Sequence, residues 1–455
     1  MVRCIDYLYE RNSMNTGYLE VKHTTSLQGT VDLIGAKNAV LVIMASLLLT
    51  TGKSKLYNVP ASADVEHMIK LLQHLGADIH FWVQDHILEV DTTSVNKWRV
   101  HADIMKKMRA SILVMGPLLA RFGRAEVAVP GGCVLGERPI DYHLSNFVKM
   151  GVVIDEQAEF LHARADQLHA KKLVLEYPSV GATENCMMAA CLTRGTTRIV
   201  NAALEPEVLD LITVLKKMGA HIVIEAPATI LIEGVETLCP IEHSIIPDRL
   251  EAGALLIAAA ATGGSIYLPQ APAYVMEVFL LKLEQMGHSI EIGAGDTGVR
   301  LKACHAPRAV SFKTGPYPSF PTDLQAPMMA LQCTASGTSI IQETVFENRL
   351  LHVRELQKMG AQIRVEHNTA VITGVDQLYG AQVIATDIRA SCALVVAGLM
   401  AQGMTVITGL HHWRRGYDML EQKLAHIGAS IAIREGEVPA TVYGAPNNVA
   451  PVIRA

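Results

Sequence analysis

The chain has 455 residues and a formal net charge of −5, with 50% hydrophobic and 18% charged residues. This length suits two or three domains, and the apolar content excludes a disordered chain. The acidic balance argues against a protein built to bind a nucleic-acid backbone, so we expect no nucleic-acid partner.

The longest apolar runs, 39–49 and 252–261, are shorter than the ~18 residues that a membrane-spanning helix needs, and we expect no membrane insertion. Eight cysteines are scattered without a CxxC pair. This usage argues against a structural metal site and favours reduced thiols in a cytoplasmic protein. The N-terminus lacks the apolar region of a secretory signal, Met14 is an alternative start, and residues 436–455 are expected to form a loose tail.

An amphipathic segment, a glycine and an apolar-alternating strand recur six times, 68 to 75 residues apart. The six glycines are Gly76, Gly151, Gly219, Gly287, Gly360 and Gly428. A second glycine precedes each of them by 23 to 28 residues, and these are Gly52, Gly123, Gly195, Gly264, Gly337 and Gly403. Two synchronised markers indicate six copies of one structural unit.

Each unit begins with a helix that is apolar on nearly every face, such as 39–52, and such a helix should be buried. The first glycine ends this helix by adopting a positive φ, and a short strand follows. An amphipathic helix comes next; in 64–77, Val65, Met68 and Leu72 share one stripe. The second glycine stops it and a strand pair completes the unit, which therefore follows a βαβαββ order.

Six buried helices fit two cores better than one, so we predict three units per domain. The predicted domains are 37–246, which carries the Cys133 loop, and 1–36 together with 247–435. The N-terminal segment 18–35 should pair with strands of the second half. Two chain crossings would then act as a hinge, and the cleft between the domains is the expected ligand site.

Polar residues gather at the predicted starts of the apolar helices. They include Lys37, Asn38, Arg109, Ser179, Val180, Gly181, Asp248, Arg249, Asp323, Asp387 and Arg389. A helix N-terminus presents unpaired N–H groups and a positive dipole end, and added Lys or Arg makes an anion site. For any single position, helix capping and local ion pairing are the favoured alternative. The recurrence in both halves favours anion binding for the set.

The segment 129–143 (VPGGCVLGERPIDYH) interrupts the second unit with a glycine-rich loop. Such a loop can close over a ligand, and Cys133 lies at its tip. Nearby Arg138 would favour a reactive thiolate, while an ordinary surface cysteine is the alternative. Four other cysteines fall within apolar helices and are predicted to be core residues: Cys186, Cys191, Cys333 and Cys392.

These motifs resemble those of the UDP-N-acetylglucosamine 1-carboxyvinyltransferases, within the enolpyruvyl transferase family. The matching motifs are collinear from about Leu19 to Arg434 and include SLQGTVDLIGAKNA, PGGCVLGERPIDYH, FPTDLQA and ETVFENRLLHV. The resemblance implies a two-domain inside-out α/β barrel of the EPSP synthase type, with six βαβαββ repeats, three per domain. It also implies transfer of the enolpyruvyl group of phosphoenolpyruvate to the 3′-hydroxyl of UDP-N-acetylglucosamine, releasing phosphate, in the first committed step of peptidoglycan synthesis.

The resemblance assigns catalytic roles to three residues. Lys37 would contact phosphoenolpyruvate, and Asp323 would act as the base near the sugar 3′-hydroxyl. Cys133 would be the general acid, form a covalent adduct with phosphoenolpyruvate and be the site that fosfomycin alkylates. No cofactor and no metal are implied, the partners implied are the two small-molecule substrates, and no protein partner follows from the motifs.

The substrate-binding positions follow from the same motif matches. Arg109, Arg138 and Arg389 would lie in the phosphoenolpyruvate and diphosphate region, and Ser179, Val180 and Gly181 would hold the UDP phosphates by their backbone. Asn38, Val345 and Arg349 would lie near the sugar, and Asp141 and His143 near the uridine.

The chain departs from the family pattern where lysines are common, with Ala61, Ala63 and Tyr177 in their place. These changes remove positive charge from the expected nucleotide side. The alternatives are therefore a catalytically impaired UDP-N-acetylglucosamine-binding paralogue, a 5-enolpyruvylshikimate-3-phosphate synthase, and a repeat-built scaffold without a small ligand. The PGGC loop argues against the synthase, and the charges at the helix starts argue against the scaffold.

Overall fold

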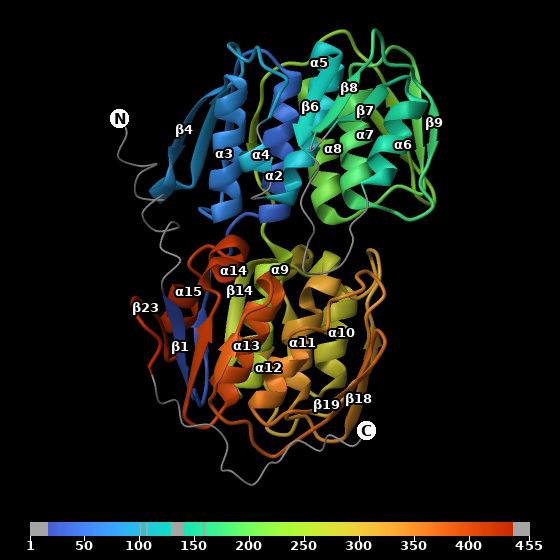
Figure 1. The fold of residues 1–455 in the computed structure, drawn as a ribbon. Coiled ribbons are helices and arrows are strands. Elements are labelled where there is room, and N and C mark those ends of the chain that lie inside the picture. Colours follow the sequence, from blue (N-terminus) through green and yellow to red (C-terminus); the bar gives the residue numbers. More distant parts are fainter. Residues whose placement is uncertain (1–16, 101, 106–107, 129–139, 158–159, 440–455) are drawn as a thin grey trace. The chain divides into compact units, whose positions relative to one another are not determined.

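The structure is a computed structural model that describes residues 17–439 except 101, 106–107, 129–139 and 158–159. The described residues divide into two compact units (Figure 1). Unit 1 contains those of 35–246, and unit 2 contains 17–34 and 247–439. Within the described parts, the strands form six sheets, three in each unit.

Unit 1 contains two four-stranded sheets, in the orders β13-β3-β5-β4 and β11-β12-β10-β9, and a three-stranded sheet, β6-β8-β7, among its described residues. Its strands are β3 (Lys53–Tyr57), β4 (Asp78–Trp82), β5 (Ile87–Asp91), β6 (Arg124–Ala128), β7 (Val153–Gln157), β8 (Phe160–Arg164), β9 (Lys172–Val174), β10 (Thr196–Val200), β11 (His221–Glu225), β12 (Thr229–Glu233) and β13 (Glu242–Ser244). Its helices are α2 (Lys37–Ser46), α3 (Ala63–Leu75), α4 (Ala102–Met105), α5 (Met115–Phe122), α6 (Asp141–Lys149), α7 (Val180–Ala190) and α8 (Pro206–Met218), with 3-10 turns η1 (Leu47–Leu49), η2 (Val83–Asp85) and η3 (Arg109–Val114).

The core of unit 1 is built from the apolar helices that begin each repeat. Nine of the ten residues of α2 are buried, as are nine of the eleven residues of α7, which confirms the expectation of helices buried on every face. Helices α5 and α7 approach so closely at Gly116 that an added Cβ there would lie 2.3 Å from the carbonyl oxygen of Asn185. A side chain at this position is therefore incompatible with the packing.

Unit 2 contains three four-stranded sheets among its described residues, ordered β21-β22-β1-β23, β15-β16-β14-β2 and β17-β18-β20-β19. Its strands are β1 (Tyr18–Lys22), β2 (Gln28–Thr30), β14 (Ser265–Pro272), β15 (Ser289–Ile292), β16 (Thr297–Lys302), β17 (Phe312–Lys313), β18 (Thr338–Gln342), β19 (Gln362–Glu366), β20 (Thr369–Thr373), β21 (Gln382–Ile384), β22 (Met404–Thr408) and β23 (Ile431–Arg434). Its helices are α9 (Arg249–Ala261), α10 (Glu277–Gln285), α11 (Gln325–Gln332), α12 (Val353–Lys358), α13 (Ile388–Met400), α14 (Leu410–Gly416) and α15 (Leu420–His426), with 3-10 turns η4 (Ala273–Val275), η5 (Ala294–Asp296) and η6 (Thr322–Leu324).

The N-terminal strands belong to the sheets of unit 2. Strand β1 lies between β22 and β23 and is antiparallel to both, with Leu19 opposite Ile407 on one side and Ile433 on the other. Strand β2 pairs in parallel with β14. The predicted return of the N-terminal segment to the second half of the chain is therefore confirmed.

The glycines that stop the amphipathic helices all have a positive φ, from 96° to 109°, as predicted. Of the upstream glycines, five also have a positive φ, whereas the expectation for Gly264 is wrong. Gly263 takes the left-handed conformation there, with φ 67°. Gly264 instead lies against the backbone, where an added Cβ would come within 2.3 Å of the carbonyl oxygen of Leu27. This glycine is required by close packing rather than by its own φ.

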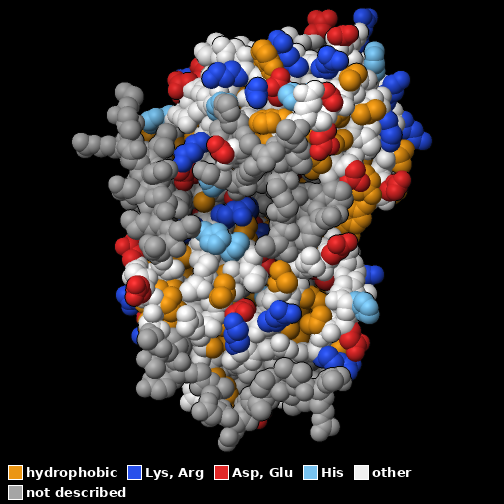
Figure 2. Space-filling view, in the orientation of Figure 1, with side chains coloured by type: hydrophobic (Ala, Val, Ile, Leu, Met, Phe, Trp, Pro, Cys, Tyr) orange, Lys and Arg blue, Asp and Glu red, His pale blue; other side chains and the backbone are white. Residues whose placement is uncertain are grey.

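Charged side chains of both signs are interspersed on the face shown in Figure 2, with hydrophobic side chains scattered between them. This mixed pattern, among the described residues of that face, accords with the small net charge of −5. None of the helices in the described part of the chain has the length and apolarity that a membrane crossing requires.

Candidate active site

Polar residues at the starts of the buried helices act in part as N-caps, as the capping alternative predicts. The side chain of Ser179 accepts a hydrogen bond from the backbone of Ala182 at the start of α7. Asp248 caps α9 through the backbone N–H groups of residues 250 and 251, and Asp387 caps α13 through those of residues 389 and 390. These three side chains satisfy N–H groups that a helix start leaves without partners.

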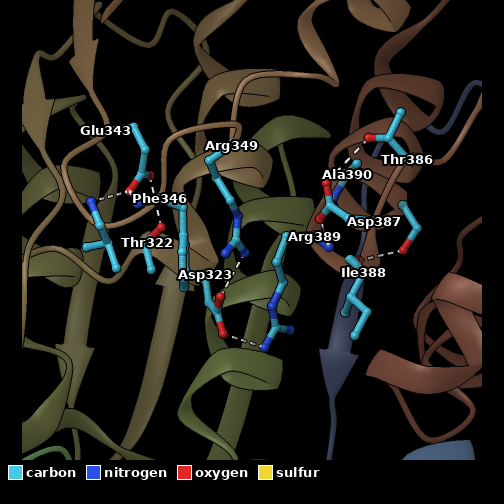
Figure 3. A network of polar contacts seen from close by, with 12 residues as sticks. Thr322, Asp323, Glu343, Phe346, Arg349, Thr386, Asp387, Ile388, Arg389 and Ala390 are labelled. Atoms are coloured by element: carbon cyan, nitrogen blue, oxygen red, sulfur yellow. Dashed lines mark hydrogen bonds and ion pairs between the residues drawn. The ribbon is translucent and has the colours of Figure 1, made fainter. Parts of the chain in front are cut away.

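Unit 2 holds a cluster of one carboxylate and two guanidiniums (Figure 3). The two oxygens of Asp323, in η6, each accept a hydrogen bond at 2.8 Å, Oδ1 from Nη2 of Arg349 and Oδ2 from Nη2 of Arg389. The side chains of Arg349 and Arg389 are only 3% and 6% exposed, whereas that of Asp323 is 24% exposed. The sequence expectations for these three residues thus meet in one ion-pair network that solvent reaches at the carboxylate.

The charges in this cluster determine its acid–base behaviour. Desolvation opposes ionisation of Asp323, but the Arg389 and Arg349 guanidiniums outweigh it and hold the pKa of the carboxyl well below its usual range. Burial likewise disfavours the charge of Arg389, while Asp323 keeps its pKa well above the ordinary value. In this arrangement Asp323 is ionised and stabilised by both arginines, which makes it a weak proton acceptor.

The neighbours of the cluster hold it in place. The phenol of Tyr417 lies 3.2 Å from Nη1 of Arg389, so this guanidinium is held on two sides. Glu343 accepts hydrogen bonds from the Thr322 hydroxyl at 2.9 Å and from the backbone of Val345 at 2.8 Å (Figure 3). The carboxylate of Glu343 therefore ties η6 to the turn that leads to Arg349.

In unit 1, Lys37 is the first residue of α2 and is buried. Its Nζ lies 3.0 Å from Oδ2 of Asp64, in the first turn of α3, and both side chains are at most 10% exposed. The neighbouring Asn38 is exposed. The ammonium of Lys37 is thus fixed by a carboxylate of the same unit.

A second group of candidates in unit 1 surrounds the start of α7. Val180 and Gly181 are its first two residues. The ring of His143, from α6, lies against Gly181, where an added Cβ would meet Cε1 at 3.2 Å and Nε2 at 3.3 Å. Asp141 is the exposed first residue of α6. The structure therefore brings His143 and Gly181 into contact.

Several sequence expectations fall where the structure gives no description. Cys133 and Arg138 lie outside the described residues. Arg109 begins η3, but its side chain is not described. Of the positions where the family carries lysine, Ala61 and Ala63 are buried and Tyr177 is exposed.

The predicted core cysteines are buried as expected. Burial raises the pKa of Cys186, Cys191 and Cys333 to about 12 and that of Cys392 to about 11. Thiols with such values carry little thiolate near neutral pH, so they are poor nucleophiles.

Sequence reasoning missed three residues that hold the candidates in place: Asp64 beside Lys37, Asn185 beside His143 and Tyr417 beside Arg389. Asn185 had a usable signal, because an amide inside an otherwise apolar helix needs partners. Asp64 sits in a helix start where a carboxylate is ordinary, and Tyr417 lies in no pattern that singles it out.

Comparison with known proteins places the chain in a family. Residues 21–424 match the family described as EPSP synthase (3-phosphoshikimate 1-carboxyvinyltransferase). The chain belongs to this family. It is 45% identical over 413 residues to the UDP-N-acetylglucosamine 1-carboxyvinyltransferase of Geobacter metallireducens, covering 91% of this chain and 98% of that protein. It is 47% identical over 411 residues to UDP-N-acetylglucosamine 1-carboxyvinyltransferase 1 of Caldanaerobacter subterraneus, covering 90% and 98%.

Two solved structures share the fold. The enolpyruvyl transferase NikO from Streptomyces tendae superposes with a TM-score of 0.84 at 23% identity, covering 93% of this chain and all of that one. EPSP synthase from Acinetobacter baumannii gives a TM-score of 0.72 at 15% identity, covering 92% of this chain. The predicted two-domain α/β fold of the EPSP synthase type is therefore confirmed.

Proposed function

We propose that the chain transfers the enolpyruvyl group of phosphoenolpyruvate to the 3′-hydroxyl of UDP-N-acetylglucosamine and releases phosphate. The observation that carries this proposal is the identity of 45% and 47% to enzymes named for that transfer, over 98% of their length. The proposal includes the first committed step of peptidoglycan synthesis and a cytoplasmic location. No cofactor enters the reaction.

The buried guanidiniums of unit 2 support this assignment chemically. Phosphoenolpyruvate carries a carboxylate and a phosphate, and Arg349 and Arg389 are permanent cations with forked donors for such groups. Lys37 adds a fixed ammonium from unit 1. We assign Arg109 and Arg138 to the same anionic substrate groups.

The proposed reaction is an addition followed by an elimination. Cys133 gives a proton to C3 of phosphoenolpyruvate, the sugar 3′-oxygen bonds to C2, and Asp323 takes the hydroxyl proton. The tetrahedral intermediate then loses a proton from C3 and its phosphate, which leaves an enolpyruvyl ether. The chemistry requires an acid and a base on one carbon framework, and the thiol and the carboxylate supply them.

The state of Asp323 adds a condition to this scheme. A carboxylate that accepts hydrogen bonds from two arginines is a weak base, so at least one of these bonds must break before Asp323 can take a proton. The anionic groups of phosphoenolpyruvate compete for the same N–H donors. Substrate binding would therefore raise the basicity of Asp323 when the proton has to be moved.

The nucleotide is assigned to the start of α7 and its neighbours. The backbone of Ser179, Val180 and Gly181 offers N–H groups at a helix start, where a diphosphate is favoured. Asp141 and His143 are assigned to the uridine. Asn38 and Val345 are assigned to the sugar, together with Arg349.

A phosphate-release assay with purified chain tests the function directly. Phosphate should appear only when phosphoenolpyruvate and UDP-N-acetylglucosamine are both present. Binding of the sugar nucleotide without turnover would favour the impaired paralogue, which the alanines at 61 and 63 and the tyrosine at 177 suggest. Turnover with shikimate 3-phosphate as the acceptor would instead favour the synthase.

Fosfomycin labelling tests the assignment of the thiol. Cys133→Ser should abolish both the covalent adduct and turnover. Cys239→Ser is the matched control, because Cys239 is exposed and should leave labelling unchanged. An adduct that persists in Cys133→Ser would place the reactive thiol elsewhere.

A further inference from the structure

Asn185 is a fully buried amide inside the apolar helix α7, and its partners determine which way it faces. Its Oδ1 accepts the backbone N–H of Gly116 at 2.7 Å, and its Nδ2 donates to the carbonyl of Ile112 at 3.0 Å. The reversed amide would set a donor against the N–H and an acceptor against the carbonyl. The hydrogen bonds therefore allow one orientation of the amide only.

The remaining hydrogen of the amide settles the protonation of a neighbour. Nδ2 of Asn185 lies 3.1 Å from Nδ1 of His143, and both side chains are buried. Because an amide NH₂ only donates, Nδ1 of the ring has to accept. The neutral ring then carries its hydrogen on Nε2.

That hydrogen lies at the start of α7. The Cε1–Nε2 edge of His143 is the part of the ring packed against Gly181, the second residue of the helix. A ring with its N–H at this edge supplies a donor beside the helix start, whereas the other tautomer would turn an acceptor lone pair to the same place. An oxygen acceptor of a ligand is favoured only in the first case.

We propose that Asn185 is a positioning residue for the nucleotide, which selects the Nε2–H tautomer of His143 and holds its ring against the first turn of α7. This inference rests on the proposed function, because it takes the nucleotide of UDP-N-acetylglucosamine as the ligand. The substrate group involved is an acceptor oxygen of the nucleotide. Gly116 takes part because an added Cβ there would lie 2.5 Å from Oδ1 of Asn185.

The tautomer itself can be measured without any substrate. In protein labelled with ¹⁵N-histidine, the ring signals of His143 are assigned by their loss in His143→Gln. We expect Nδ1 to resonate as an unprotonated nitrogen and Nε2 as a protonated one. A protonated Nδ1 in the neutral ring of the unmodified chain would overturn the inference, whatever any variant does.

Asn185→Asp removes the donor while keeping the size of the side chain. The carboxylate should draw a proton onto Nδ1 of His143, so the variant should show the reversed tautomer or a doubly protonated ring. Unchanged His143 signals in this variant would contradict the proposal. The matched control is Asn146→Asp, a buried asparagine of α6 that donates to the Tyr142 carbonyl, and it should leave the tautomer as it is.

Steady-state kinetics separate positioning from general damage. In Asn185→Asp, KM for UDP-N-acetylglucosamine should rise about tenfold or more, while KM for phosphoenolpyruvate and kcat change by less than about threefold. Equal losses in all three constants would mean a structural role and would overturn the inference. If the unmodified chain neither binds nor turns over UDP-N-acetylglucosamine, the proposed function fails, and the nucleotide-positioning role fails with it even where the tautomer is found.

Discussion

Replacing Asp323 by asparagine tests how the two arginines of unit 2 are stabilised. The change keeps the shape of the side chain and removes the negative charge that both guanidiniums contact at 2.8 Å. Arg349 and Arg389 remain charged in almost fully buried positions, because arginine does not deprotonate in proteins. The variant therefore leaves two cations facing each other across a neutral amide.

The expected cost follows from the burial of the partners. Removing one member of a fully buried ion pair destabilises a protein by about 3–5 kcal/mol. Asp323 is 24% exposed, so water screens part of the loss and we expect about 2–3 kcal/mol. For a unit of this size each kcal/mol lowers Tm by roughly 2–4 °C, which gives a decrease of about 4–12 °C.

Thermal unfolding with and without inorganic phosphate is the assay. Phosphate should raise the Tm of Asp323→Asn more than that of the unmodified chain, because in the latter the anion has to displace Asp323. Exposed Asp296 in the same unit provides the control variant, Asp296→Asn, for which little change is expected. Equal Tm values for the Asp323 variant and the unmodified chain, or equal responses to phosphate, would refute the reasoning.

The same variant has a defined pH dependence. The folded-state pKa of Asp323 lies well below its unfolded value of about 3.9, so its stabilisation is complete above that value. It is lost as the pH falls toward the folded-state pKa. The difference in stability between the two chains should therefore be constant near neutrality and shrink only in acid, below about pH 4.

Three further predictions concern other parts of the chain. Burial raises the pKa of Glu251 to about 7, so ionising it costs stability as the pH rises from about 4.5 to 7; Glu251→Gln should remove up to roughly 3 kcal/mol of this slope in urea unfolding, and identical slopes would contradict it. Gly253→Ala places a Cβ 2.4 Å from Cδ1 of Leu324, in the turn that carries the candidate base, and should cost about 1–3 kcal/mol and lower turnover; an unchanged Tm would show that the turn yields freely. Iodoacetamide should modify exposed Cys239 in the native chain and spare buried Cys191, as peptide mapping can establish; early labelling of Cys191 would mean that the core opens.

The repeat pattern made the fold predictable, because it depends on composition and spacing. Helices that are apolar on every face have to be buried, and the burial of α2 and α7 follows from that alone. The return of the first strand was also predictable, since the second half lacked a partner for its last strands. The stop glycines at the ends of amphipathic helices were predictable from their need for a positive φ.

The pairing of side chains was not predictable in the same way. Asp323 contacts arginines 26 and 66 residues away, and no local pattern determines which of several polar helix starts meet. The resemblance supplied these residues one by one, but their direct ion pairs depend on how α13 and η6 pack. Gly264 shows the same limit, since its closeness to the backbone of Leu27 is a property of tertiary packing.

The position of β1 in its sheet has a consequence for biosynthesis. Leu19 emerges from the ribosome early, whereas its neighbour Ile407 follows about 390 residues later. At about 5–20 residues per second, the strand waits for tens of seconds before either flanking strand exists. During that time the apolar side chains of Leu19 and Val21 are exposed on a nascent polypeptide. Folding helpers that act on unfinished chains would meet this stretch first, and a chain cut short before β22 would leave it permanently without partners.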